Sequence, residues 1–281
     1  MLLLEIVKFV FFSIAIVLIS KYILVKVLRD LGEALELEAT SIGNISGIAT
    51  SMPELLTVCF SAFVGLMESS VYNILSSNII NFIQYLFSIF LNKNHKRLKN
   101  KAIIIDLVLV LVTIIIPILM IIFKITSNIR IVPLFIILLI YFYYLNIQAH
   151  KKYLSKEDEE LKERLNRDNI IKKRKFKKIF KYTIYLILVG ITLYIVGNLL
   201  STVLTNLCNI FGVSEMILGI LLGFITSIPE LITFFEAQKY YVLDRNAELG
   251  VIEATNNLLT SNLFNIFVIQ SLGIIIFSIV T

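Results

Sequence analysis

Long apolar stretches separated by short polar segments recur along the whole of this 281-residue chain. An α-helix needs about 20 apolar residues to cross a hydrocarbon core roughly 30 Å thick, and the stretches are close to that length. The pattern predicts an all-α, polytopic membrane protein with eight transmembrane helices. The predicted spans cover residues 6–27, 35–64, 70–91, 103–124, 131–148, 180–205, 210–237 and 249–279.

Basic residues are concentrated in alternate loops between these spans. The loops after the second and sixth spans have no Lys or Arg, and the loop after the fourth has only Lys124 and Arg130. Cytoplasmic loops carry an excess of Lys and Arg, so the basic loops are predicted to be cytoplasmic. The N-terminus then lies outside a cell membrane. The basic loops are marked by Lys26 and Arg29, by residues 93–101, by residues 149–179 and by Lys239 and Arg245.

Composition supports a membrane protein and narrows the possible partners. Hydrophobic residues make up 58% of the chain, the mean hydropathy is +0.88, and 16% of residues are charged. A typical soluble domain has about 25% charged residues. The net charge of +6 arises in the loops, so it predicts contact with the lipid bilayer and no nucleic-acid partner. Two cysteines are predicted to be packing residues, two histidines to lie in loops, and two further acids to be interfacial: Cys59, Cys208, His95, His150, Asp106 and Glu253.

Two unlike motifs each occur twice, in the same order. Residues 47–55 read GIATSMPEL and residues 223–231 read GFITSIPEL; residues 77–81 read SNIIN and residues 261–265 read SNLFN. The sequence therefore predicts a first repeat at 1–148 with five helices, a charged cytoplasmic linker at 149–179, and a second repeat at 180–281 with three helices. Because five spans precede it, the second repeat is inverted. Inverted repeats place a substrate site between them near the bilayer midplane.

The first motif combines a helix-breaking proline with a carboxylate inside each span. Pro53 and Pro229 remove a backbone donor and free the carbonyls of the preceding turn. Glu54 and Glu230 follow, although a charge at the bilayer centre costs at least about 2.5–3.5 kcal/mol. Since these spans contain no Lys or Arg, a bound cation is the expected counter-charge. Carboxylate, carbonyl and hydroxyl oxygens favour Ca²⁺, Na⁺ or Mg²⁺.

The second motif adds a polar stripe to each of two further spans. Residues four apart share one helix face, so one stripe holds Asn73, Ser77 and Asn81 and the other holds Asn257, Ser261 and Asn265. Four of its residues are expected to face the ion: Ser77, Asn81, Ser261 and Asn265. For Asn78 and Asn262, ion binding and hydrogen bonding between helices remain equal alternatives.

These residues resemble the cation/calcium exchanger superfamily, and within it the sodium/calcium exchanger type. That family carries two inverted repeats with Gly-Thr-Ser-x-Pro-Glu and Gly-Ser-Asn-x-x-Asn/Asp motifs. It works by alternating access, in which the first helix of each repeat slides against the rest. The resemblance implies the divalent ligands Glu54 and Glu230, the carbonyl donors Thr50 and Thr226, the sodium ligands Ser51, Ser77, Ser227 and Ser261, and the family's Asn/Asp position at Asn81 and Asn265.

The sequence departs from the family pattern in three ways, the first of which is Asn265 at a position where sodium/calcium exchangers often carry Asp. Four larger residues replace family glycines and are expected to narrow close helix contacts: Ala49, Ser76, Ile225 and Thr260. The family has five spans in each repeat, whereas the second repeat here has three. That difference leaves open a homo-oligomer in which a second protomer completes the fold.

The predicted function is a secondary cation antiporter that exports Ca²⁺ in exchange for Na⁺ and uses no cofactor. A cation/proton exchanger and a transport-inactive, ion-binding membrane protein are the alternatives. An enzyme is disfavoured, because the chain has no HExxH motif, no paired membrane aspartates and no Ser/His or Cys/His constellation.

Overall fold

The computed structural model describes residues 2–35, 37, 39–63, 65–153, 172–212, 214–240 and 247–281. Most of the predicted linker at 149–179 lies outside these residues. The described part is helical, and it contains no strand. Seven of its helical stretches are long and apolar enough to cross a membrane, and they correspond to the second to eighth predicted spans. Residues 2–35, which hold the predicted first span, are helical but are not among the seven, so the number eight stays a prediction.

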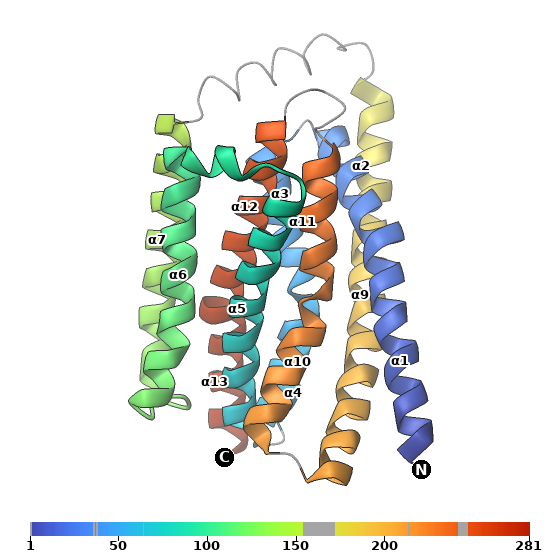
Figure 1. Cartoon of the computed structure of the whole chain (residues 1–281), viewed down its shortest axis with the longest axis vertical. Helices are drawn as coiled ribbons and strands as arrows, with labels where there is room; N and C mark the ends of the chain where they lie inside the picture. The colour runs from blue at the N-terminus through green and yellow to red at the C-terminus, as the bar shows by residue number, and fades with distance from the viewer. Residues whose placement is uncertain are drawn as a thin grey trace.

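The described helices are arranged in one bundle (Figure 1). In the first half they are α1 (Leu2–Ile19), a π-helical segment (Ser20–Leu24), α2 (Val25–Leu35), α3 (Ala39–Thr50), α4 (Met52–Phe63), α5 (Met67–Leu91), α6 (Lys101–Ile122) and α7 (Val132–Tyr153). Short 3₁₀ helices lie at His95–Lys99 and Ile129–Ile131. The second half contains α9 (Lys172–Phe211), α10 (Glu215–Thr226), α11 (Ile228–Tyr240), α12 (Ala247–Leu263), a π-helical segment (Phe264–Ile269) and α13 (Gln270–Val280).

Two of the predicted spans are broken at equivalent places. The break between α3 and α4 falls at Ser51, two residues before Pro53, and the break between α10 and α11 falls at Ser227, two residues before Pro229. Proline has no N–H to donate to the preceding turn, so each break follows from the sequence. The prediction that these prolines interrupt their helices is confirmed.

Two apolar clusters divide the bundle. The larger cluster joins α4, α5, α6, α7, α11, α12 and α13, and its largest buried side chains include Tyr85, Phe234 and Phe267. The smaller one joins α1, α2, α9 and α10 through residues such as Ile16, Leu193 and Leu222. Figure 1 shows α1, α2 and α9 side by side at one edge, and both chain ends at one end of the bundle.

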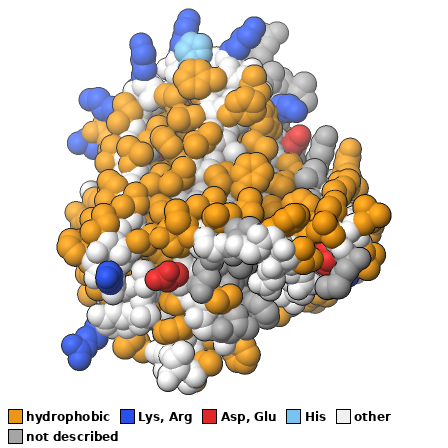
Figure 2. Space-filling model, turned by 60° about the horizontal axis from the view of Figure 1, so that its bottom comes forward, with side chains coloured by type: hydrophobic (Ala, Val, Ile, Leu, Met, Phe, Trp, Pro, Cys, Tyr) orange, Lys and Arg blue, Asp and Glu red, His pale blue; other side chains and the backbone are white. Residues whose placement is uncertain are grey.

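The outer surface suits a hydrocarbon environment. Large apolar side chains remain exposed along α1, α6, α7 and α9. Figure 2 shows hydrophobic side chains over much of the face in view, with Lys and Arg toward its margins. Apolar flanks with basic margins are the pattern of a helical membrane protein.

One interpretation from the sequence is wrong, the placement of His150 in a loop, and two acids that were expected at the membrane interface are buried inside the bundle. Asp106 is fully buried and lies 2.7 Å from Nε2 of His150, which belongs to α7 and not to a loop. Glu253 is buried too and pairs with Arg29. Hydropathy locates a residue along a span, but the packing of α6, α7 and α12 against one another decides whether it is buried. Cys59 is a free, half-buried thiol in α4, as expected of a packing residue.

Candidate cation-binding site

Two of the broken-helix segments, α3 and α10, cross the helices α12 and α5 at close range. A Cβ added to Gly47 of α3 would lie 2.6 Å from the carbonyl oxygen of Asn257 in α12. A Cβ added to Gly223 of α10 would lie 2.6 Å from the carbonyl oxygen of Asn73 in α5. Only a glycine permits such an approach of one backbone to another. The two crossings bring the first motif of each half against the second motif of the other half.

The expected narrowing of these contacts stays a prediction, but a glycine lies opposite two of the four larger residues. Ser76 and Thr260 replace family glycines, but Gly223 faces Ser76 and Gly47 faces Thr260 across the crossing. The glycine at each crossing therefore lies on the helix opposite the one that carries Ser76 or Thr260. The Ser76 hydroxyl donates to the carbonyl oxygen of Asn73 at 3.0 Å, and the Thr260 hydroxyl donates to Oδ1 of Asn44 at 2.7 Å.

Serine hydroxyls link the two halves at the breaks. Ser77 donates to Oε1 of Glu54 at 2.8 Å and lies 2.9 Å from the hydroxyl of Ser227. Ser261 donates to Oε1 of Glu230 at 3.1 Å, and its hydroxyl lies 2.8 Å from that of Ser51. Glu54 is thus linked through Ser77 to the helix break at Ser227, and Glu230 is linked through Ser261 to the helix break at Ser51.

Both glutamates are fully buried without a counter-charge. Glu54 and Glu230 have no exposed surface, and neither takes part in an ion pair among the described residues. The nearby Thr50 and Thr226 hydroxyls donate to backbone carbonyls of their own helices, those of Ser46 at 2.9 Å and Gly223 at 3.4 Å. A buried carboxylate in this setting requires a cation or a proton.

Among the buried oxygen atoms of the described residues that have no hydrogen-bond partner, six lie at equivalent positions of the two halves. They form three pairs at matching positions of the two halves: Oε2 of Glu54 and Glu230, Oδ1 of Asn73 and Asn257, and Oδ1 of Asn81 and Asn265. Buried polar atoms are rarely left unpartnered, so each needs an explanation. All six are hard oxygen acceptors, the atoms that bind Ca²⁺, Mg²⁺ and Na⁺.

Hydrogen bonds from the amide nitrogens fix the orientation of these asparagines. Asn73 donates to the Thr57 hydroxyl at 2.5 Å, and Asn257 donates to the Thr233 hydroxyl at 2.7 Å. Asn81 donates to the Ser261 hydroxyl at 3.3 Å. With the nitrogen engaged, the oxygen of each amide is left for another ligand.

Asn78 and Asn262 have a different arrangement. Each amide donates to the backbone carbonyl of the other, at 3.4 Å and 3.2 Å. Asn78 also accepts from Nδ2 of Asn265 at 3.1 Å. These reciprocal bonds hold α5 and α12 together, so the structure favours the bridging alternative for this pair.

Four residues around the site are absent from the set expected from the sequence. Asn73 and Asn257 carry unpartnered oxygens, and Thr57 and Thr233 hold their amides. The signals were present: each asparagine precedes a motif serine by four residues, and both threonines follow their Pro-Glu pairs at the same spacing.

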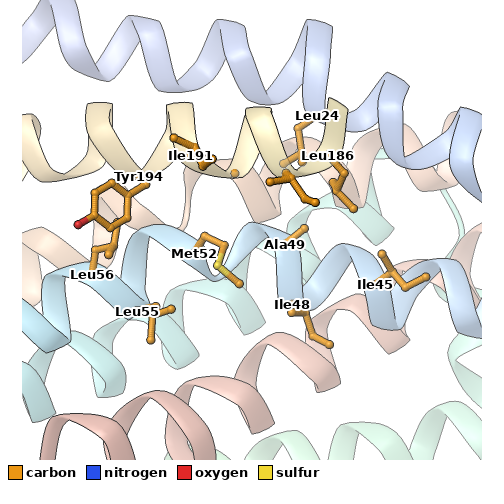
Figure 3. Close-up of a pocket in the computed structure, with 12 residues that line it drawn as sticks. Leu24, Ile45, Ile48, Ala49, Met52, Leu55, Leu56, Leu186, Ile191 and Tyr194 are labelled. Carbon is orange, nitrogen blue, oxygen red and sulfur yellow. The ribbon is translucent and has the colours of Figure 1, made fainter. Parts of the chain in front are cut away.

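Other features of the described part are less suited to a cation. It contains no group of three or more His, Cys, Asp and Glu side chains that could hold a metal. A cavity of about 540 Å³ lies between α9 and α3–α4, but apolar side chains such as Met52 and Leu186 line it (Figure 3). The oxygen-rich set at the breaks is therefore the stronger candidate.

The paired broken helices and buried carboxylates define a membrane protein of the cation-exchanger class. The family described as sodium/calcium exchanger protein matches residues 6–149 and 181–281, and the chain belongs to this family. This confirms the family and the fold class predicted from the repeated motifs. No curated protein sequence matches the chain.

Solved structures support the fold. The sodium-calcium exchanger NCX_Mj, soaked with 100 mM Na⁺ and 10 mM Sr²⁺, matches with a TM-score of 0.61 at 18% identity, over 98% of this chain and 83% of that one. The same exchanger soaked with 10 mM Na⁺ and zero Ca²⁺ matches with a TM-score of 0.60 at 18% identity, over 98% and 84%. At this identity the likeness establishes the architecture alone.

Proposed function

We propose that the protein is a secondary antiporter that exports Ca²⁺ in exchange for Na⁺. The observation that carries the proposal is the set of six unpartnered oxygens, which includes two carboxylates and lies where the two halves meet. In this proposal Glu54 and Glu230 neutralise one divalent ion, and the asparagine oxygens complete its shell. The serines at the breaks and the Thr50 and Thr226 carbonyls serve as further ligands for Na⁺ or Ca²⁺.

Competition for one set of oxygens couples the two fluxes. Two carboxylates balance one Ca²⁺, two Na⁺ or two protons, so the arrival of one kind of ion displaces the other. Such exchange needs access from each side in turn. The helix at 2–35 and α9 lie side by side and pack into the smaller apolar cluster, and an apolar cavity lies between part of α9 and α3–α4 (Figure 3). These features support the helix at 2–35 and α9 as the moving pair.

Location and assembly belong to the same proposal. A multi-pass membrane protein of this family works as a transporter and not as an enzyme, and the proposed activity needs no cofactor. We place the N-terminus outside the cell membrane and the basic loops in the cytoplasm, with repeats at 1–148 and 180–281. A homo-oligomer is an alternative to a single working chain, and the mass of the purified protein in detergent distinguishes them.

Cation/proton exchange is the second candidate, because a buried carboxylate without a basic partner can bind a proton in place of a metal ion. Radioactive Ca²⁺ flux in proteoliposomes separates the candidates. A Na⁺ gradient at constant pH should drive Ca²⁺ uptake if the first proposal is right. Uptake driven by a pH gradient in Na⁺-free buffer would favour the second. Calorimetric Ca²⁺ binding without flux under either gradient would favour the transport-inactive alternative.

A further inference from the structure

A buried ion pair fastens α2 to α12. Arg29 donates from Nη1 to Oε2 of Glu253 at 2.9 Å and from Nη2 to Oε1 at 2.8 Å. The Arg29 side chain is 11% exposed and the Glu253 side chain 5%. The guanidinium carbon also lies 4.1 Å from the ring centroid of Tyr240, at the end of α11. The pair thus joins the helix that we propose to move to the two helices that carry the second half of the candidate site.

A small cavity lies between this ion pair and Thr233, a hydrogen-bonded neighbour of the candidate site. Its volume is about 10 Å³, close to the minimum for one water molecule. Arg29 and Glu253 line one part of it, and Ser46 of α3 and Thr233 of α11 line another. Thr233 donates to the carbonyl oxygen of Glu230 and holds the amide of Asn257. The ion pair therefore lies one hydrogen-bonded residue away from two proposed ligands.

Helix packing does not require the carboxylate at this position. At the equivalent crossing in the other half, Ser69 occupies the place of Glu253. A Cβ on Gly43 would lie 2.4 Å from the Glu253 carbonyl oxygen, and one on Gly219 would lie 2.5 Å from that of Ser69. The two crossings are thus equally close, although only one of them has an acidic residue at this position. Buried ion pairs add little net stability, and their best-attested role is in switching or register.

We propose that Arg29 and Glu253 form a gate, and that Glu253 is a further cation-binding position which the Arg29 guanidinium occupies while the gate is closed. When α2 moves away, the Arg29 guanidinium leaves the Glu253 carboxylate and a Ca²⁺ ion takes its place, with Ser46 and Thr233 beside it. The guanidinium acts as a tethered competitor for the ion. This inference rests on the proposed function for its direction, although its test does not depend on transport.

Counting bound Ca²⁺ ions tests the binding part. Equilibrium binding of radioactive Ca²⁺ to the purified full chain in detergent should give one more ion per chain for Arg29→Gln than for the wild type. The double variant R29Q/E253Q should return to the wild-type number. Arg97→Gln is the matched control, because Arg97 pairs with the more exposed Glu248 and its loss uncovers no buried carboxylate. An unchanged number in R29Q would overturn the binding position.

Labelling tests the gate. Ser46→Cys is placed in a background with Cys59→Ala and Cys208→Ala, and a membrane-impermeant maleimide is added to vesicles of each orientation. The introduced thiol should react slowly when Arg29 and Glu253 are both present, and at least about fivefold faster when R29Q or E253Q is added. The faster reaction should occur only when the maleimide is on one side of the membrane. Equal rates in all three proteins would refute a gate.

The E253Q variant and the number of bound Ca²⁺ ions distinguish a failure of the Glu253 position from a failure of the central site. E253Q breaks the same ion pair by removing the acid, so it should open the gate without adding a bound Ca²⁺ ion. It therefore replaces R29Q in the labelling test if R29Q does not fold. If the wild type binds no Ca²⁺ but R29Q binds one, the central site fails and the Glu253 position stands. If the wild type binds one and R29Q also binds one, the central site stands and the Glu253 position fails.

Discussion

Gly223→Ala tests whether the close crossing of α10 and α5 sets the geometry of the candidate site. The new Cβ would lie 2.0 Å from the Ser76 hydroxyl oxygen, 2.6 Å from the Asn73 carbonyl oxygen and 2.9 Å from the Ser77 nitrogen. The hydroxyl can rotate away, but the two backbone atoms cannot. Bringing the carbonyl contact from 2.6 Å to 3.4 Å, where ordinary contact begins, moves the helices apart by about 0.8 Å.

That displacement is large compared with what an ion site tolerates. The hydroxyls of Ser77 and Ser227 are 2.9 Å apart, and a further 0.8 Å or so takes them beyond hydrogen-bonding distance. Metal–ligand distances hold to within about 0.2 Å. Overpacking of this kind costs about 1–3 kcal/mol of folding free energy, so the variant should still fold. We expect Ca²⁺ affinity to fall by roughly 10–100-fold, as when a residue that orients a metal ligand is lost.

Isothermal titration calorimetry with Ca²⁺, together with thermal unfolding in the same detergent, measures both effects. Gly190→Ala in α9 is the control, because an added Cβ there meets no atom within 4 Å. It should bind Ca²⁺ like the wild type and be more stable by up to about 1 kcal/mol, the usual gain of alanine over glycine in a helix. Wild-type affinity in Gly223→Ala would refute the link between the crossing and the site.

Three further changes have defined outcomes. Gly47→Ala at the equivalent crossing should weaken Ca²⁺ binding as much as Gly223→Ala in the same calorimetric titration; a tenfold difference between them would contradict the pairing of the two halves. Ser77→Ala removes the donor to Glu54 and should lower Ca²⁺ affinity by roughly 10–100-fold at little cost in melting temperature, and an unchanged affinity would remove this serine from the site. Asp106→Ala leaves His150 without its buried partner while Asn146 keeps its bond to Asn256, so thermal unfolding should show a loss of about 1–3 kcal/mol; a wild-type melting temperature would argue against this cluster.

Local chemistry made the breaks and their acids predictable. Proline cannot continue the hydrogen-bond ladder, and the motif around Pro53 recurs at Pro229, so both the interruptions and Glu54 and Glu230 could be found without a structure. The face shared by Ser77 and Asn73 followed from helical spacing.

Contacts across helices could not be predicted in the same way. The sequence cannot reveal that the glycine missing at Ser76 is supplied by Gly223 on the opposing helix, because that depends on where α5 and α10 cross. The burial of Asp106 likewise depends on α7 and α12 covering it. Asn73 was missed as a ligand because an amide in a span is as often a helix bridge, and only its unpartnered oxygen separates the two roles.

The central claim is that two buried carboxylates, one from each half, hold one divalent ion together. Calorimetric titration of Ca²⁺ into Glu54→Gln and Glu230→Gln tests it most directly, with Glu68→Gln as the control, since Glu68 is exposed at the start of α5. Each of the first two variants should lose more than the roughly 100-fold in affinity expected from a supporting residue, while the control should bind one ion like the wild type. Wild-type affinity in either buried variant, in a protein that still folds, would contradict a shared site.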